Sequence, residues 1–368
     1  MKKSVVIIGT RGYPSYYGGF ETLVRNLAPF LSARGWEVTV YGREGATEDH
    51  DSGRDPSVRT VLTRGIDSKS LSTLSYGLTS SIHAAVTRPD VALVMNVANG
   101  YWLPILKSRR IPTVVNVDGI EWDRAKWGKK ARTAFKLGAH LTAKFGDRIV
   151  VDSHEIERRW WEDFHRSGDF IPYGGSDPGP LQSVDGLTPG GYALMVARFV
   201  EENTVEAFFE AAEDISTDWE VVIVGSSGYG GKLDLRAEQL SKNSPRIHWM
   251  GHISDDQKLF SLWQNSGAYF HGHSVGGTNP ALVQAMACGA PIVARDTVFN
   301  REVLGDSGRF VSPTPSAITA SIRSLLGDND RQAELRRSAR DRQAAEYTWD
   351  IVCKAYETSL LDALFSTL

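Results

Sequence analysis

The chain has 368 residues, 41% hydrophobic and 23% charged, and its 41 lysines and arginines against 44 aspartates and glutamates give a formal net charge of −3. This composition is ordinary for a folded protein of about two domains, and it excludes a disordered tail, a collagen-like chain and a small disulfide scaffold. A net charge so close to zero also excludes a protein that binds nucleic acid through its overall charge.

Cysteine content and hydropathy indicate the compartment. The sequence has only two cysteines, Cys288 and Cys353, which argues against a disulfide framework and favours a reducing environment. The apolar run Val5–Ile8 stops at Gly9, too early for a signal peptide, and no stretch approaches the ~20 apolar residues of a membrane span. We therefore expect a cytoplasmic protein.

Short apolar runs alternate with longer amphipathic stretches in the first half of the chain. Runs of valine and isoleucine without polar alternation predict strands buried on both faces, as in parallel sheets, and the helical stretches between them fit βαβ units. The predicted strands are 4–8, 36–41, 91–96, 113–117 and 148–151, and a helix is predicted over 20–34.

The pattern pauses over residues 171–191, which are rich in glycine, proline, serine and aspartate and indicate a linker with turns. A second α/β series follows. Its predicted strands are 192–197, 219–225, 247–250, 268–270 and 291–294, and its predicted helices are 204–215, 279–288, 314–326, 329–345 and 348–366. Gly289 is a typical stop for the helix before it.

Two such series predict an α/β protein of two doubly wound, Rossmann-like domains. We expect an N-terminal domain over 1–175, a C-terminal domain over 176–345 and a final helical segment over 346–368. Ligands of doubly wound sheets bind outside the carboxyl ends of the strands, so two such domains facing a central cleft would hold a small molecule there.

The loop 9–21 leaves the first predicted strand and enters the first predicted helix. Its glycines let the backbone approach a ligand closely, and a helix N-terminus favours an anion, so a phosphate near Gly18 and Gly19 is one interpretation. A glycine-rich turn without a ligand is the alternative. The loop has neither the G-x-G-x-x-G dinucleotide fingerprint nor a Walker motif.

A second loop, 270–280, also connects a strand to a helix. Thr278 or Asn279 can cap the helix and Pro280 suits its first turn. The free amides at Gly277, Thr278 and Asn279 would then point at an anion. Two anion-binding loops, one in each domain, suit a ligand with a diphosphate.

Three further side chains accompany these loops. His271 and His273 suggest a metal, but no carboxylate or cysteine stands at ligand spacing, so a non-metal role is favoured. Arg198 follows the strand 192–197 and can bind phosphate oxygens with its guanidinium fork. A surface ion pair with a neighbouring glutamate at 201 or 202 is the alternative.

Five motifs resemble a known family. They are GTRGYPSYYGGFETLVRNLA (9–28), NVDGIEWDRAKW (116–127), IPYGG (171–175), ARFVEENTVE (197–206) and HGHSVGGTNPALVQAMACGAPIVA (271–294). Together they resemble the GT-B glycosyltransferases of family 4, and most closely a bacterial subgroup that includes rhamnosyltransferases of surface polysaccharide assembly. The resemblance implies that the final helix crosses back to the N-terminal domain.

The resemblance implies a donor site for a nucleoside diphosphate sugar. Arg198 would hold the diphosphate. Many relatives have a lysine where this chain has Asn203, and a pair of glutamates where it has Gly276 and Gln284. The first of those glutamates normally contacts hydroxyl groups of the donor sugar, so Gly276 fits a deoxy sugar or a contact made by the backbone. The second normally contacts the ribose, and Gln284 loses the charge-assisted hydrogen bond that a glutamate makes there. The full implied donor set is Gly18, Gly19, Arg198, Asn203, Gly225, Gly276, Gly277, Thr278, Asn279 and Gln284.

The other implied roles concern catalysis and the acceptor. Asp118 would orient the acceptor or stabilise positive charge at the anomeric carbon, with Glu121 as a second carboxylate. A simple Asp-Gly turn is the alternative for Asp118. Glu21 and Trp122 are placed on the acceptor side, although Glu21 can equally be a first-turn carboxylate that the helix dipole stabilises.

The segment 124–148 carries eight lysines and arginines and one acidic residue, interleaved with aromatic and leucine residues. A basic helix of this kind is typical of one that lies on an anionic membrane, and a solvated face over core aromatics is the alternative.

The predicted function is therefore retaining, metal-independent transfer of a hexose or deoxyhexose such as rhamnose. The donor would be a dTDP or UDP sugar and the acceptor a saccharide or lipid-linked saccharide, with no cofactor and no nucleic acid. Two alternatives remain open. A nucleotide-sugar epimerase of the same fold would use Asp118 and Glu121 as acid and base, and a catalytically weak binding or scaffold homologue would explain Gln284 and Asn203.

Overall fold

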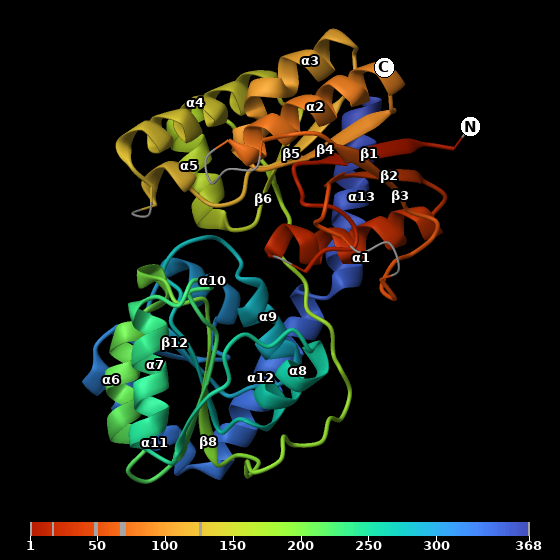
Figure 1. Cartoon of the computed structure of the whole chain (residues 1–368). Helices are drawn as coiled ribbons and strands as arrows, with labels where there is room; N and C mark the ends of the chain where they lie inside the picture. The colour runs from red at the N-terminus through yellow and green to blue at the C-terminus, as the bar shows by residue number, and fades with distance from the viewer. Residues whose placement is uncertain (1, 17, 48–50, 67–70, 125–126, 367–368) are drawn as a thin grey trace. The chain divides into compact units, whose positions relative to one another are not determined.

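The computed structural model describes residues 2–16, 18–47, 51–66, 71–124 and 127–366. The chain divides into two compact units. Unit 1 comprises Met1–Tyr173 together with Trp349–Leu368, and unit 2 comprises Gly174–Thr348. In each unit helices cover both faces of a sheet whose strands are all parallel (Figure 1).

The sheet of unit 1 has seven strands among the described residues, in the order β3-β2-β1-β4-β5-β6-β7. Its strands are β1 (Ser4–Ile8), β2 (Glu37–Arg43), β3 (Arg59–Thr63), β4 (Val91–Met95), β5 (Thr113–Asn116), β6 (Arg148–Val151) and β7 (Asp169–Phe170). Its helices are α1 (Gly19–Ala33), α2 (Ser72–Thr87), α3 (Leu103–Ser108), α4 (Lys129–Phe145), α5 (His154–Phe164) and α13 (Trp349–Phe365), with 3₁₀ turns η1 (Val97–Trp102) and η2 (Glu121–Asp123).

The sheet of unit 2 has six strands among the described residues, in the order β10-β9-β8-β11-β12-β13. Its strands are β8 (Tyr192–Val196), β9 (Glu220–Val224), β10 (Ile247–Trp249), β11 (Ala268–His271), β12 (Ile292–Arg295) and β13 (Arg309–Val311). Its helices are α6 (Val205–Ile215), α7 (Lys232–Asn243), α8 (Asp256–Asn265), α9 (Pro280–Ala287), α10 (Val298–Leu304), α11 (Pro315–Leu326) and α12 (Asn329–Glu346), with the 3₁₀ turn η3 (Glu201–Asn203).

Every strand and helix predicted from the sequence is present, with ends that differ by no more than two residues. The prediction omitted the edge strands β3, β7 and β13. Their side chains are only half-buried or exposed, so no continuous apolar run marks them. It also gave no bounds for the helices α2, α3, α5, α7, α8 and α10. The buried residues of α2, for example, are mostly glycine, alanine and serine, which leave no clear apolar pattern.

The strand order reverses once in each sheet. In unit 1 the chain leaves β1 toward one edge and β4 toward the other, and in unit 2 the same happens at β8 and β11. Such a switch point opens a crevice at the carboxyl ends of the two strands, because their connections run to opposite faces. Each sheet therefore has one preferred place for a ligand.

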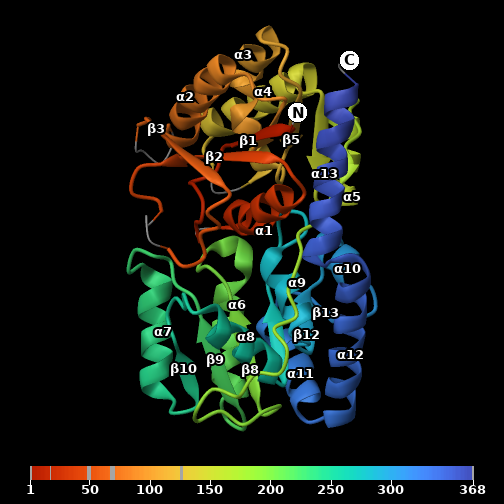
Figure 2. The same ribbon diagram turned by 90° about the vertical axis from the view of Figure 1, so that its right-hand side faces the viewer.

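Helix α13 packs against α1 and β5 in unit 1 (Figures 1 and 2). Its buried Glu357 bonds the guanidinium of Arg34 and accepts a hydrogen bond from Trp36 Nε1 at 3.0 Å. Tyr356, fully buried, accepts a bond from Asn116 Nδ2 at 2.6 Å at the end of β5. The last helix is thus an integral part of unit 1.

We expect Glu357→Ala to destabilise unit 1 by about 1–3 kcal/mol, because the indole N–H of Trp36 would stay buried without an acceptor. Glu357→Gln keeps that acceptor and loses only the ion pair with a half-exposed arginine, so its cost is smaller. Urea unfolding of both variants measures the difference. Equal losses would mean that the ion pair and not the indole bond carries the stabilisation.

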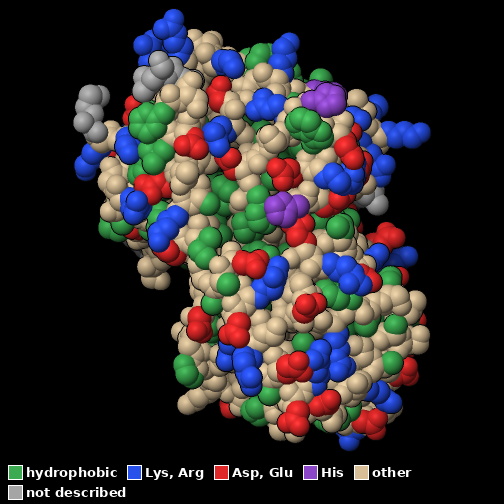
Figure 3. Space-filling model, turned by 180° about the vertical axis from the view of Figure 1, so that it is seen from behind, with side chains coloured by type: hydrophobic (Ala, Val, Ile, Leu, Met, Phe, Trp, Pro, Cys, Tyr) green, Lys and Arg blue, Asp and Glu red, His purple; other side chains and the backbone are tan. Residues whose placement is uncertain are grey.

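The surface mixes both signs of charge, as Figure 3 shows for one face, where lysines and arginines alternate with aspartates and glutamates. Among the described residues no helix combines the length and the apolar character that crossing a membrane requires.

Candidate functional site

Hydrogen bonds to the carbonyl of Arg198 shape the turn after β8. Arg198 is exposed, and its carbonyl accepts bonds from Val200 N at 2.9 Å and from Asn203 Nδ2 at 2.9 Å. Asn203 itself is 4% exposed. Its amide therefore shapes the turn that presents Arg198.

Two glycines bring neighbouring loops into contact with this turn. Gly225, after β9, has φ +133° and lies where a Cβ would collide with the carbonyl of Ala197. Gly272, after β11, lies where a Cβ would collide with the carbonyl of Asn203. Both positions thus require glycine. Gly225, expected in the donor site, lines the loop junction with its backbone.

Hydrogen bonds tie the loop after β11 to the turn after β8. Ser274 donates from its N–H at 3.0 Å and from its hydroxyl at 2.8 Å to the carbonyl of Glu202. Thr204 donates to the carbonyl of Gly272 at 2.6 Å. The structure therefore brings the two predicted elements, Arg198 and the loop 272–279, to the same edge of the sheet at its switch point.

The end of this loop forms the N-terminus of α9. Asn279 caps the helix by accepting a bond from Ala281 N at 2.9 Å, and Pro280 occupies the first turn, as predicted. Gly276 has φ +98°, and Thr278 is buried. Within the described part of the chain the amides of Gly276 and Gly277 donate to no protein acceptor. These loop amides lie just before the N-cap of α9, in the loop that bonds to the turn of the exposed Arg198, and such a combination of donors suits an anion.

Gln284 lies one turn further along α9 and is engaged within the protein. Its Oε1 accepts a bond from Ser176 N at 3.0 Å and its Nε2 donates to Ser176 O at 2.8 Å. Only a side-chain amide can pair with a peptide group in this way, since a glutamate would face the Ser176 carbonyl without a proton. Oε1 therefore keeps one lone pair that could accept the expected hydrogen bond from a ribose hydroxyl.

His271 and His273 stack with ring centroids 4.4 Å apart and an interplanar angle of 14°. Tyr269 Oη and His271 Nδ1 are 3.0 Å apart, and His271 is fully buried. Burial, and secondarily His273, lowers the pKa of His271 well below its ordinary value, so the ring is neutral. No group of three metal-ligating side chains forms among the described residues.

The neutral His271 predicts an acid-sensitive fold. Its pKa is lowered on folding, so its contribution to stability is present above pH 6.5, the ordinary histidine value, and is lost as the pH falls below it. One such histidine costs about 1.4 kcal/mol between pH 7.5 and 5.5. Urea unfolding at both pH values should show this loss in the wild type and a smaller one in His271→Gln. Parallel losses would contradict the assignment.

At the switch point of unit 1, the loop after β1 approaches the end of β4. Gly9 has φ +97°, and a Cβ there would strike the carbonyl of Met95. Gly18 is the N-cap of α1, and its carbonyl accepts a bond from Thr22 N at 3.0 Å, while Gly19 opens the helix. Glu21 is buried and accepts a bond from Arg11 N at 3.1 Å, which makes it a brace of this loop.

Asp118 lies after β5, beside Asn96 after β4. Both residues have a positive φ, +60° for Asp118 and +69° for Asn96. A positive φ is uncommon for residues other than glycine, and such residues cluster at functional sites. Asn96 Nδ2 donates to Asp118 Oδ2 at 3.3 Å, and Asp118 N donates to Asn116 Oδ1 at 2.9 Å. Sequence reasoning missed Asn96, although a polar residue directly after a buried strand is a usable signal.

Two further polar residues surround Asp118. Tyr173 is buried, and its pKa is raised well above the usual value by burial first and then by the carboxylates of Asp118 and Asp152. Asp152, directly after β6, is 4% exposed. Sequence reasoning missed Asp152 as well. The carboxyl edge of unit 1 is thus rich in acceptors for hydroxyl groups.

Glu121 and Trp122 take structural positions. Glu121 is buried and bonds the guanidinium of Arg124 through Oε1 and Trp127 Nε1 through Oε2 at 2.7 Å. Trp122 is buried and packs edge-on against Trp160 and Phe164. Glu121 was expected to be catalytic and Trp122 to face the acceptor, but these contacts favour packing roles for both.

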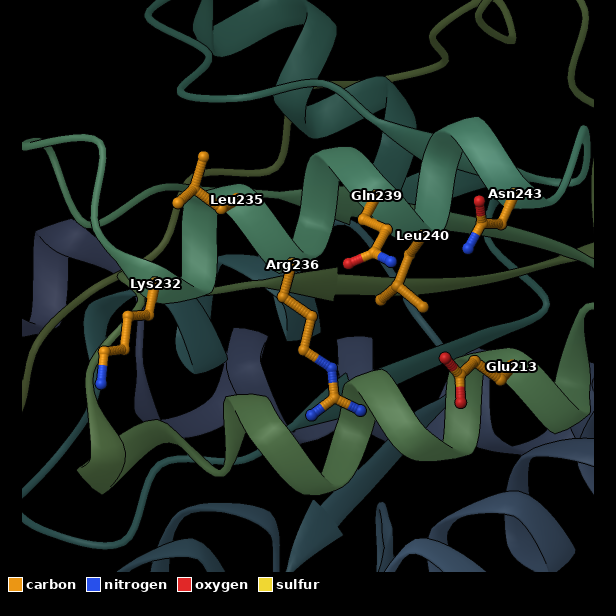
Figure 4. Close-up of a pocket in the computed structure, with 7 residues that line it drawn as sticks. All are labelled: Glu213, Lys232, Leu235, Arg236, Gln239, Leu240 and Asn243. Carbon is orange, nitrogen blue, oxygen red and sulfur yellow. The ribbon is translucent and has the colours of Figure 1, made fainter.

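A separate surface pocket of about 330 Å³ lies between α6 and α7 (Figure 4). It is lined by Glu213, Lys232, Leu235, Arg236, Gln239, Leu240 and Asn243. It includes none of the residues that the sequence places in the donor site.

Comparison with solved structures identifies the class of the fold. The chain superimposes on sucrose-phosphate synthase from Thermosynechococcus elongatus with a TM-score of 0.80 at 18% identity, covering 100% of both chains. It superimposes on Anabaena HepE in complex with UDP with a TM-score of 0.77 at 14% identity, covering 98% of this chain and 100% of the other. The two Rossmann-like units make this a GT-B protein.

Sequence comparison then gives the family. Residues 17–171 match the model of Glycosyltransferase Family 4, and residues 188–342 match that of Glycosyl transferases group 1. With a match in each half, the chain belongs to the family-4 GT-B glycosyltransferases.

Curated relatives match over part of their length. O-antigen chain mannosyltransferase B of Escherichia coli is 25% identical over 50% of this chain and 49% of its own length. Phosphatidyl-myo-inositol mannosyltransferase of Mycolicibacterium smegmatis is 32% identical over 38% of this chain and 37% of its own length. The chain thus spans about half the length of these relatives or less.

Proposed function

We propose that this protein is a retaining glycosyltransferase that moves a hexose or deoxyhexose from a nucleoside diphosphate sugar to a saccharide or lipid-linked saccharide acceptor, in surface polysaccharide synthesis. The observation that carries the proposal is that the turn of Arg198 and the loop of Gly276 and Gly277 are hydrogen-bonded to each other at the switch point of unit 2. Together they combine charge and backbone donors in the way a diphosphate requires.

The donor is of the UDP or dTDP type. HepE, which shares the fold, was solved with UDP, and with UDP and glucose. Two curated relatives are named as mannosyltransferases, which supports a hexosyl donor. A deoxy sugar such as rhamnose fits Gly276, because a glycine offers no side chain to hydrogen-bond a sugar hydroxyl.

The chemistry follows from where charge develops. As the glycosidic bond to the diphosphate breaks, negative charge grows on the leaving oxygen, and Arg198 with the loop amides stabilises it. Asp118 stabilises the positive charge that grows at the anomeric carbon. The acceptor hydroxyl oxygen bonds to the anomeric carbon on the face that the diphosphate leaves, and the departing phosphate accepts the proton of that hydroxyl, so the reaction needs no protein base. The residues present support this route without a metal ion.

The test is a thermal-shift panel of UDP, dTDP, GDP and their sugars in metal-free buffer, on the wild type and on Gln284→Glu. A ligand that binds only the folded state raises Tm. We expect a selective shift with UDP or dTDP species. Because glutamate breaks the pairing with Ser176, Gln284→Glu should start from a lower Tm. No shift in either protein would overturn the donor site. Donor binding without turnover on a broad acceptor panel would favour the scaffold alternative.

Helix α4 supports an added proposal, peripheral contact with the inner face of a membrane. Lys129, Lys130, Lys136 and Lys144 are exposed on it, and Leu137 between them is 49% exposed. Clustered lysines with an apolar side chain suit an anionic lipid surface. Flotation with vesicles of phosphatidylglycerol and phosphatidylcholine should recover the wild type but not a Lys130→Glu, Lys136→Glu variant. Equal flotation of both proteins would contradict the contact.

A further inference from the structure

We propose that Arg295 is a second diphosphate-binding cation of the donor site and shares the donor's charge with Arg198. The inference rests on the proposed function and names one more residue of the same site. Sequence reasoning gave Arg295 no role. The sequence gives no sign of this role, because residues 204, 272 and 295 come into contact only in the folded sheet.

The position of Arg295 places it at the switch-point edge. It ends β12, which pairs with β11 so that Ala294 lies beside His271. Side chains alternate along a strand, so Arg295 lies on the same side as Val293, which packs in the core beneath α6. The guanidinium thus lies toward the N-terminus of α6, directly after the turn that presents Arg198.

One hydrogen bond of its side chain fixes this orientation. Arg295 Nη1 donates to Thr204 Oγ1 at 3.0 Å, and Thr204 Oγ1 in turn donates to the carbonyl of Gly272. The backbone is held as well, because Asn300 Nδ2 donates to the carbonyls of Arg295 at 2.8 Å and His273 at 3.0 Å. Arg295 therefore joins the two loops that form the anion site.

Among the residues that the structure describes, none provides a counter-ion for the charge of Arg295. Its side chain is half-buried, and no carboxylate of the described residues lies within 4.0 Å of its nitrogens. The neighbouring Asp296 is paired instead with Arg301, at 2.8 Å between Oδ2 and Nη2. A partly buried guanidinium with four unused N–H donors is well placed to bind an anion.

The ligand needs this second charge. A diphosphate carries at least two negative charges at neutral pH, and Arg198 supplies one positive charge. Asn203, where many relatives have a lysine, is neutral and buried against the turn. Arg295 bonds to Thr204, the residue that follows Asn203 in the sequence. It therefore brings a positive charge to the turn in which Asn203 supplies none.

Calorimetric titration with uridine, UMP and UDP on the wild type, Arg295→Gln and Arg295→Lys tests the inference, with the thymidine series in place of uridine if dTDP gives the larger thermal shift. We expect Arg295→Gln to weaken UDP binding about tenfold or more, UMP by less and the nucleoside not at all. Arg295→Lys should retain part of the affinity. Arg301→Gln, which removes a neighbouring exposed arginine, is the control and should bind like the wild type.

The outcomes distinguish a failure of the proposed function from a failure of the role of Arg295. If the wild type binds neither UDP nor dTDP, the proposed function fails. If the wild type binds and Arg295→Gln binds equally well, the role of Arg295 is wrong. If Arg295→Gln loses nucleoside and diphosphate affinity alike, the residue supports the loop structure only. Circular dichroism and Tm of each variant establish that it is folded.

Discussion

Replacement of Arg198 with alanine should lower kcat/KM by about 10²–10³-fold, the range found when one preorganised donor to a developing anion is removed. The side chain is exposed, and only its backbone carbonyl takes part in the turn, so the fold should stay intact. Most of the loss should fall in kcat, because negative charge on the leaving diphosphate is greatest in the transition state.

Two companion variants separate charge from architecture. Arg198→Lys keeps the charge but not the two-pronged donor geometry, so it should recover only part of the activity. Asn203→Ala removes the buried bond to the Arg198 carbonyl and should lower Tm while costing less activity. Steady-state kinetics with the donor found in the thermal-shift panel measure all three. An alanine variant with wild-type kcat would remove Arg198 from the mechanism.

The central strands could be predicted because burial on both faces leaves a clear trace in the sequence. Val91–Met95 and Tyr192–Val196 are almost wholly buried, and their apolar runs give their limits to within one residue. The reversal of strand order then places the loops after β1 and β8 at the switch points, which is where doubly wound sheets bind ligands. The edge strands β3, β7 and β13 carry no such signal, because their side chains are only half-buried or exposed.

The partners of polar side chains were not predictable, because they depend on contacts between distant segments. Gln284 resembled a weakened ribose ligand, but its amide pairs with the backbone of Ser176, 108 residues away in sequence. Glu121 resembled a second catalytic carboxylate, but both its oxygens are bonded to Arg124 and Trp127. Arg295 approaches Thr204 only because β12 lies beside β11.

Asp118→Asn should lower kcat by about 10²-fold or more, within the range that one positioned group contributes to catalysis, and should leave the donor Kd within about twofold. Asparagine has the same shape and tolerates the left-handed backbone at this position, so the change removes a charge and little else. Single-turnover kinetics with saturating donor measure the chemical step directly. A variant that keeps wild-type kcat would favour the simple Asp-Gly turn over a catalytic carboxylate.

The matched control acts on Asn96, which donates to Asp118 and caps η1 by accepting a bond from Ala98 N at 2.9 Å. Asn96→Asp keeps the cap and the left-handed backbone but replaces the donor with a second negative charge beside Asp118. That charge disfavours ionised Asp118, so the acid side of the pH–rate profile should move to higher pH. Asn96→Gly removes the donor without adding charge and should lower kcat with little displacement of the profile. If both variants shift the profile equally, the effect comes from the lost Asn96 Nδ2 donor, which both variants remove, and not from the charge added beside Asp118.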